Sequence, residues 1–149
     1  MKGGVVVKRS LVVIGAAAAA VLAGCGGSGV STPTPAAKLQ QVRGSSVGQV
    51  VLTQSGAQRI GVQTAAAERA DTGRAKVVIP YSAIVYDVTG QTYAFKQVKP
   101  LTYVEVPVKV GHVAGRSAYL VKGPQPGTPI VTIGAEELYG VQSGVLAQT

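Results

Sequence analysis

Val77-Val78-Ile79-Pro80-Tyr81-Ser82-Ala83-Ile84-Val85-Tyr86-Asp87 opens the segment that decides the fold, and Gly127-Thr128-Pro129-Ile130-Val131-Thr132-Ile133-Gly134-Ala135 closes it. Between these two stretches lie short runs of β-branched and aromatic residues, separated by turn residues. Such runs, at this spacing, are typical of an all-β domain. The sequence therefore predicts an all-β fold with one or two short helical turns.

The clearest expected strand is 101–110, where residue type alternates along the chain. A strand sends successive side chains to opposite faces of its sheet, so one parity should line a core and the other should meet water. Pro107 cannot donate a ladder hydrogen bond, which predicts an edge strand or a bulge at that point. The core set is Val104, Val106, Val108 and Val110, and the water-facing set is Tyr103, Glu105, Pro107 and Lys109.

Turn and capping residues place the other elements. Thr53 is a good N-cap and Gly61 a good terminator, which predicts a brief helix over 54–60. Asp87-Val88-Thr89-Gly90 predicts a hairpin turn between strands at 84–86 and 91–97. Further strands are expected at 50–52, 62–66, 77–79, 118–121 and 129–133, helical turns at 81–84 and 135–139, a loop at 69–76 and a turn at 111–117.

Composition narrows the class of protein. Charged residues make up only 13% of the chain, while it holds 20 glycines and 8 prolines, which suits a small β domain better than a helical bundle. The formal net charge is +8, and it falls to about +5 without Lys2, Lys8 and Arg9, which belong to an expected leader. The remaining basic residues are scattered singly, so we expect no nucleic-acid partner.

Residues 1–24 have the three parts of a bacterial lipoprotein signal peptide. Lys2, Lys8 and Arg9 form the positive region, and Leu11–Ala23 is apolar but shorter than the roughly 20 residues of a membrane span. Leu22-Ala23-Gly24-Cys25 resembles the lipobox, in which small residues fit the peptidase and the thiol is alkylated with diacylglycerol. The alternative is an ordinary signal peptide with an accidental cysteine. We expect Cys25 to be the lipid attachment site, and the protein to be extracytoplasmic and lipid-anchored to the bacterial cell membrane.

Composition also divides the mature chain. Gly26-Gly27-Ser28-Gly29 and Ser31-Thr32-Pro33-Thr34-Pro35 have almost nothing apolar to bury, so residues 25–48 are predicted to be a flexible tether. Some 20 residues of coil would span on the order of 25 Å. The β domain is expected over 49–146, followed by a tail at 147–149.

No pattern of reactive residues predicts catalysis. His112 is the only histidine, which leaves no His-Asp-Ser relay and no His-rich metal site, and we expect it to be a solvated side chain in a loop. Glu136 and Glu137 could be read as an acid–base pair, but charge at the positive end of a helical turn is the simpler interpretation. Ser82 lacks a nucleophile elbow, and no phosphate-binding glycine loop is found. We therefore expect no catalytic, cofactor-binding or metal-binding residues, no cofactor and no enzyme activity, and we expect any exposed tyrosine to be a candidate contact residue.

Three segments of the chain are distinctive when taken together: Val51-Leu52-Thr53 with Arg59-Ile60-Gly61-Val62, then 79–85, then 123–138. They resemble a known family, the periplasmic adaptor subunits (membrane fusion proteins) of RND-type efflux systems. The first segment is similar to the family's lead-in to the β domain, the second to its recurrent "VPxSAV" element and the third to its "GLxxGxxVVTVGAxxL" closing strand. The resemblance covers about 50–145 and implies their membrane-proximal domain, a small antiparallel β-barrel or β-roll. Nothing between Cys25 and Ala70 resembles the adaptors' lipoyl-like domain or helical hairpin.

The resemblance implies a non-enzymatic, lipid-anchored, adaptor-like subunit that associates with an RND or ABC export transporter. Its partners would be that transporter, the bilayer that holds acylated Cys25 and, as a further option, copies of itself. The alternative is a ligand-binding or sensing lipoprotein of the cell envelope. A large apolar pocket lined by the inward valines and tyrosines would favour ligand binding. A filled core with an apolar patch on one outer edge would favour docking.

Overall fold

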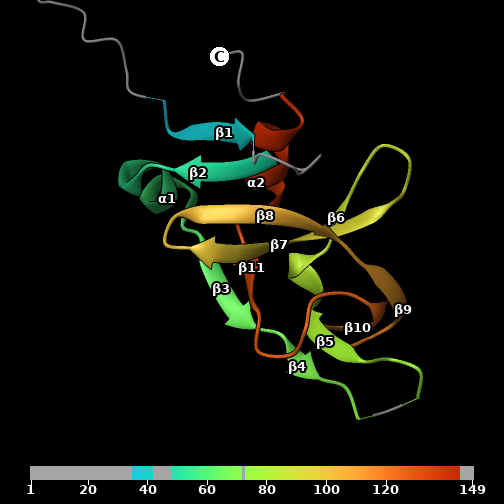
Figure 1. Cartoon of the computed structure of the whole chain (residues 1–149). Helices are drawn as coiled ribbons and strands as arrows, with labels where there is room; N and C mark the ends of the chain where they lie inside the picture. The colour runs from blue at the N-terminus through green and yellow to red at the C-terminus, as the bar shows by residue number, and fades with distance from the viewer. Residues whose placement is uncertain (1–34, 42–47, 72, 145–149) are drawn as a thin grey trace, which may run out of the picture. The chain divides into compact units, whose positions relative to one another are not determined.

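The computed structural model of the chain describes residues 35–41, 48–71 and 73–144 (Figure 1). The predicted signal peptide 1–24, the lipid attachment at Cys25, part of the predicted tether and the predicted tail 147–149 lie outside the described residues. The described residues form two antiparallel sheets with two short α-helices, which confirms the all-β class.

The larger sheet has seven strands in the order β1-β2-β8-β7-β11-β3, and β6 also pairs with β7. β7 is its central strand, because β8 pairs along one edge while β6 and β11 share the other. Every pairing is antiparallel. The strands are β1 (Ala37–Gln41), β2 (Gly48–Leu52), β3 (Gln63–Ala66), β6 (Val85–Tyr86), β7 (Thr92–Lys99), β8 (Thr102–Pro107) and β11 (Pro129–Ile133).

The smaller sheet has the order β4-β5-β10-β9, with bounds Glu68–Arg69, Val77–Pro80, Ser117–Lys122 and Lys109–Ala114. The chain passes directly from one sheet to the other at Ala67, between β3 and β4, and at Val108, between β8 and β9. Both residues are buried. The strand order of the described residues gives two open sheets joined by these bends rather than a closed barrel.

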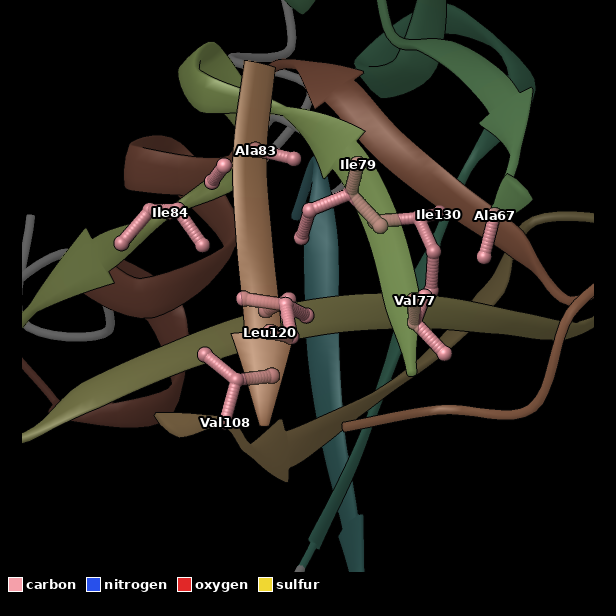
Figure 2. Packing of buried hydrophobic residues seen from close by; sticks show 10 residues of the cluster. Ala67, Val77, Ile79, Ala83, Ile84, Val108, Leu120 and Ile130 are labelled. Carbon is pink, nitrogen blue, oxygen red and sulfur yellow. The ribbon is translucent and has the colours of Figure 1, made fainter. Parts of the chain in front are cut away.

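A first core lies between the two sheets, and we call it the inter-sheet core. Figure 2 shows Ile79 of β5 beside Ile130 of β11, and Leu120 of β10 beside Val108. Burial of these apolar side chains holds the smaller sheet on one face of the larger one. Its members are Ala67, Val77, Ile79, Ala83, Ile84, Ala94, Val108, Ala118, Leu120 and Ile130.

A second core, the helix-side core, lies on the opposite face of the larger sheet. Helix α2 (Ala135–Gln142) packs there against β2, β6 and β7, and α1 (Gln54–Ile60) packs against β2. The middle of the larger sheet is therefore buried on both faces, which explains why adjacent residues such as Ala94 and Phe95 of β7 and Ile130 and Val131 of β11 are all apolar and buried. The members are Val50, Leu52, Val85, Phe95, Tyr103, Val131, Ala135, Leu138 and Val141.

The helix and the hairpin turn predicted from capping and turn residues are confirmed at α1 and between β6 and β7. The Thr53 hydroxyl accepts a hydrogen bond from the Gly56 amide (3.0 Å), and Gly61 ends the helix in the left-handed conformation with φ 69°. The Asp87–Gly90 turn joins β6 and β7 as expected. A short 3₁₀ turn, η1 (Tyr81–Ala83), confirms the predicted helical turn after Pro80.

The prediction of one strand over 101–110 is wrong, because the chain bends at Val108. The Val108 amide donates to the Thr92 carbonyl (3.0 Å), and the Thr92 hydroxyl donates to the Val108 carbonyl (2.8 Å). The chain bends where these bonds form, and the two strands on either side of the bend, β8 and β9, belong to different sheets. The edge strand or bulge expected at Pro107 is not found: β8 lies between β2 and β7, and Pro107 pairs in register with Tyr93, but β2 pairs with β8 only over 102–104, so Pro107 lies beyond that pairing.

The side-chain prediction for this segment is correct in part: Pro107 and Lys109 are exposed as expected, whereas Val104 is half-buried and belongs to neither core. Val108 is buried, and Val106 and Val110 pack partly against the inter-sheet core. Tyr103, expected to face water, is 3% exposed in the helix-side core, and Glu105 is half-buried. The reason is that β8 has a core on each side, so its second parity also faces protein rather than solvent.

The predicted tether is also wrong over Ala37–Gln41, which forms β1. Leu39 pairs with Val50 in a register that covers all five residues of both strands. The preceding Ala36 carbonyl accepts from the Thr53 amide (3.0 Å) and hydroxyl (3.2 Å). β1 is mostly exposed, and its sequence has no apolar alternation that would predict a strand. Its position depends on its hydrogen bonds with the edge of β2.

The turn predicted at Gly111–Ser117 is confined to Gly115 and Arg116. β9 continues through Ala114, and Gly115 has φ 58° at the first position of this two-residue loop, where glycine is favoured. His112 therefore lies within a strand and not in a loop. Helix α2 is longer than the single predicted turn.

Candidate interaction surface

Exposed tyrosines gather where β5 passes into β6. Tyr81 of η1 is 43% exposed, Tyr86 of β6 is 51% exposed, and Val88 at the tip of the following turn is fully exposed. We call these three residues the tyrosine surface. Large exposed apolar residues elsewhere in the described chain, such as Leu39 on β1 and Ile133 on β11, lie on other strands.

The backbone beneath the tyrosine surface is anchored in both cores. Ala83 and Ile84 are buried in the inter-sheet core, and Val85 is buried in the helix-side core. The Tyr81 amide donates to the Arg116 carbonyl (2.8 Å), and the Ile84 amide donates to the Tyr81 carbonyl (3.0 Å). Alternation along the strand then turns Tyr86 outward. The two tyrosines are therefore presented by a rigid support.

The two tyrosine hydroxyls contact each other, with 3.3 Å between their oxygens. The hydrogen bond with Tyr81 is the main cause that raises the pKa of Tyr86 above its ordinary value, and partial desolvation raises it further. A phenol is already protonated and neutral at physiological pH at its ordinary pKa, and the upward shift keeps it so. The pair can thus offer aromatic area with a donor and an acceptor, which suits a protein contact.

The β6–β7 turn beside the tyrosines is fixed by one carboxylate. Asp87 Oδ1 accepts from the Thr89 amide (2.8 Å), the Thr89 hydroxyl (2.7 Å) and the Gln91 amide (2.8 Å). These bonds, the Thr89 hydroxyl first, hold the pKa of Asp87 below its ordinary value. They order the turn that carries Val88 without any buried side chain at its tip.

A second carboxylate near this turn, that of Glu105, has its pKa raised rather than lowered. Burial raises the pKa of Glu105, and the negative charge of Asp87 raises it further. Tyr93, whose hydroxyl lies 3.4 Å from Asp87 Oδ2, has its pKa raised by desolvation and by both carboxylates. The side of the larger sheet next to the turn is therefore an acidic, partly desolvated region.

Two hollows lie elsewhere and are open to solvent. One, of about 370 Å³, is lined by Gly73, Arg74, Ala75, Gly111, His112 and Val121. The other, of about 460 Å³, is lined by Lys96, Val106, Pro107, Gly123, Pro124, Gln125 and Thr128. Tyr103 and the buried valines of both cores are packed against protein and are 8% exposed or less.

The residues examined as reactive candidates lie apart from one another. Ser82 is exposed in η1, and Glu136 and Glu137 are exposed in the first turn of α2, as the helix-charge interpretation predicted. His112 on β9 stacks on Tyr119 of β10, with ring centroids 4.3 Å apart. Within the described residues, no three His, Cys, Asp or Glu side chains come close enough to hold a metal ion. Across those same ranges, no helix is long and apolar enough to cross a membrane.

The sequence predicted that any exposed tyrosine would be a candidate contact residue, but it did not show which tyrosines are exposed. Tyr86 has the same strand parity as Ile84, which is buried, so alternation did not predict that Tyr86 is exposed. No signal distinguished Tyr103, which is buried, or Tyr93, which is half-buried.

The fold and this surface define a small two-sheet β domain that carries an exposed tyrosine pair. Comparison of the chain with models of protein families, with curated proteins and with solved structures finds no match.

Proposed function

We propose that this protein is a non-enzymatic, lipid-anchored extracytoplasmic subunit that docks on an export or efflux transporter, in the manner of an adaptor. The observation that carries the proposal is the tyrosine surface. Tyr81 lies within Ile79–Val85, the segment that resembles the adaptors' recurrent element, and Tyr86 and Val88 follow directly after it.

The two main resembling segments are neighbours in space, which supports the proposal. η1 packs against β11, and Ala83 and Ile84 share the inter-sheet core with Ile130. Residues 79–85 and 130–135 thus form one structural unit although about 45 residues separate them. A shared docking element would need such contiguity.

The tyrosine surface is small for a stable interface. Stable complexes bury about 1,200–2,000 Å² in total, and two tyrosines with one valine contribute only part of that. A lipid at Cys25 would confine the protein to the transporter's membrane and raise the effective concentration of a weak contact. The proposal therefore needs both the anchor and the surface.

Filled cores favour docking over the ligand-binding alternative. The inward valines Val50, Val85 and Val131 and the inward Tyr103 pack against protein, and the hollows are open depressions lined largely by loop residues. The enclosed apolar pocket that a hydrophobic ligand would require is not found among the described residues.

Site-specific crosslinking in cells tests the docking site. A photo-crosslinking amino acid at position 86 should capture a polytopic membrane permease, whereas the same group at Val98, also exposed but at the far end of β7, should not. Changing Tyr81 and Tyr86 together to alanine should increase sensitivity to an exported compound and leave the β circular dichroism spectrum intact. Equal capture from both positions would contradict a defined docking site.

Cys25→Ser tests the anchor. The altered protein should leave the membrane fraction or remain unprocessed, and crosslinking from position 86 should decrease. If the wild-type protein were soluble and cleaved elsewhere, the lipoprotein proposal would fail. Recovery of a retained apolar small molecule without any permease would favour the ligand-binding alternative.

A further inference from the structure

Basic residues concentrate on the smaller sheet, at the end away from the tyrosine surface. Arg69 ends β4 and pairs with Val77 at the start of β5, and the Lys76 amide donates to the Leu120 carbonyl of β10 (2.9 Å). Antiparallel pairing brings the end of β10 and the start of β9 to the same place. We call this the basic end: Arg69, Arg74, Lys76, Lys109 and Lys122, all exposed.

Two of these cations oppose each other directly. Lys109 of β9 and Lys122 of β10 are register partners. Directly opposed like charges destabilise a sheet, so this pair is a cost to folding. Asp71 is the acidic residue in the β4–β5 loop, and Glu68 lies one position before Arg69. The basic end therefore keeps excess positive charge that an anion would neutralise.

One cation of the basic end lines the hollow of about 370 Å³, and Lys76 and Lys122 are next in sequence to its lining residues Ala75 and Val121. Arg74 lines it from the β4–β5 loop, and His112, held by its stack on Tyr119, lines it from β9. Gly111 also lines it, at a bulge where β9 has one residue more than β10 between the paired positions. A Cβ on Gly111 would lie 3.0 Å from the Val121 side chain and 3.3 Å from the Tyr119 carbonyl. Glycine thus allows β9 to approach β10 closely at the bulge, and a side chain here would displace Val121, which also lines the hollow.

We propose that this hollow binds a phosphate group. A phosphate presents several anionic acceptor oxygens, which suit an arginine and an imidazole in the lining, with lysines nearby in the same sheet, better than a single carboxylate would. The group can belong to free phosphate, with a charge of about −1.5 to −2, or to an anionic lipid headgroup, whose phosphodiester carries about −1, since both present anionic phosphate oxygens. This site is separate from the tyrosine surface and does not depend on the proposed docking.

Titration of the purified full chain in zwitterionic detergent micelles tests the site. Inorganic phosphate should shift the NMR signals of the His112 and Tyr119 rings saturably, and sodium chloride at equal ionic strength should not. Micelles doped with phosphatidylglycerol form the second arm. Shifts with phosphatidylglycerol but not with inorganic phosphate would assign the group to a lipid, and the reverse would assign it to a soluble ligand.

Three variants separate charge, shape and folding. Arg74→Gln should weaken binding about tenfold or more, as loss of a charged hydrogen-bonding partner does. Gly111→Ala should weaken it with all charges retained. Lys109→Gln with Lys122→Gln should weaken it while leaving the unfolding temperature unchanged or higher, because the opposed charges are gone. Arg59→Gln, an equal charge change on α1, should stay within about twofold of wild type.

Two results would overturn the proposal. One is the absence of a saturable shift with either phosphate or phosphatidylglycerol. The other is equal affinity of the Arg59→Gln and Arg74→Gln proteins, which would mean that overall charge and not this hollow attracts the anion. Neither result bears on the crosslinking test of the tyrosine surface.

Discussion

Ala94 and Phe95 are neighbours in β7, both are fully buried, and they lie in different cores. Ala94 faces the smaller sheet in the inter-sheet core, and Phe95 lies under α2 in the helix-side core. Ile130 and Val131 of β11 repeat this division. The larger sheet is therefore the middle layer of the domain, and it positions both the tyrosine surface and the smaller sheet.

Phe95→Ala should lower the free energy of unfolding by about 3–5 kcal/mol, because it empties the centre of the helix-side core. Val98→Ala, on the same strand but 41% exposed, should change it by less than about 0.5 kcal/mol. Urea unfolding monitored by circular dichroism measures both. A Phe95→Ala cost near that of Val98→Ala would mean that α2 does not cover a real core.

Gly56→Ala should destabilise the domain, although glycine to alanine within a helix usually stabilises by about 0.5–1 kcal/mol. A Cβ at Gly56 would collide with the Ala36 carbonyl, to which Thr53 donates. We expect a loss of about 1–3 kcal/mol and faster hydrogen exchange of the β1 amides. Gln58→Ala, exposed on the same helix, is the control. A stabilised Gly56→Ala protein would contradict the docking of β1.

Thr89→Ala should raise the pKa of Asp87 toward its ordinary value, since the Thr89 hydroxyl is the main cause of the lowering. A carboxyl whose folded-state pKa is lowered contributes stability above its unfolded value, and this contribution is lost as the pH falls through the folded-state pKa. The order of the β6–β7 turn should therefore disappear at acid pH, and at a higher pH in the variant. An NMR titration of the Asp87 carboxyl carbon measures the shift. Val88→Ala, in the same turn, should leave that pKa unchanged.

Glu105→Gln should stabilise the domain at pH 7. Burial, with the nearby Asp87 charge, raises the folded-state pKa of Glu105, so its ionisation at neutral pH opposes folding. This penalty declines as the pH falls through the raised pKa and is gone below the unfolded value of about 4.3. Urea midpoints at pH 7 and pH 3.5 should differ from wild type only at pH 7. Glu136→Gln, at the positive end of α2, should give no stabilisation, and an equal gain from both variants would refute the burial argument.

The sequence by itself determined the features that depend on neighbouring residues. Thr53 and Gly61 bound α1 because a hydroxyl cap and a left-handed glycine act within one helical turn. The Asp87–Gly90 turn follows from side-chain-to-backbone bonds that span four residues. The all-β class follows from the same kind of local evidence, repeated along the chain.

The tertiary structure decided what each strand faces and where each sheet ends. β1 exists because β2 offers a free edge, and nothing in Ala37–Gln41 alone predicts it. Tyr103 is buried because a second core covers β8, and Tyr81 and Tyr86 are exposed because, among the described residues, no segment covers the side of η1 and β6 that carries their side chains. The bend at Val108 depends on Thr92, 16 residues earlier. The alternation of residue types along a strand shows only that the two faces of the strand differ. Whether a face is buried depends on which distant segment packs on it.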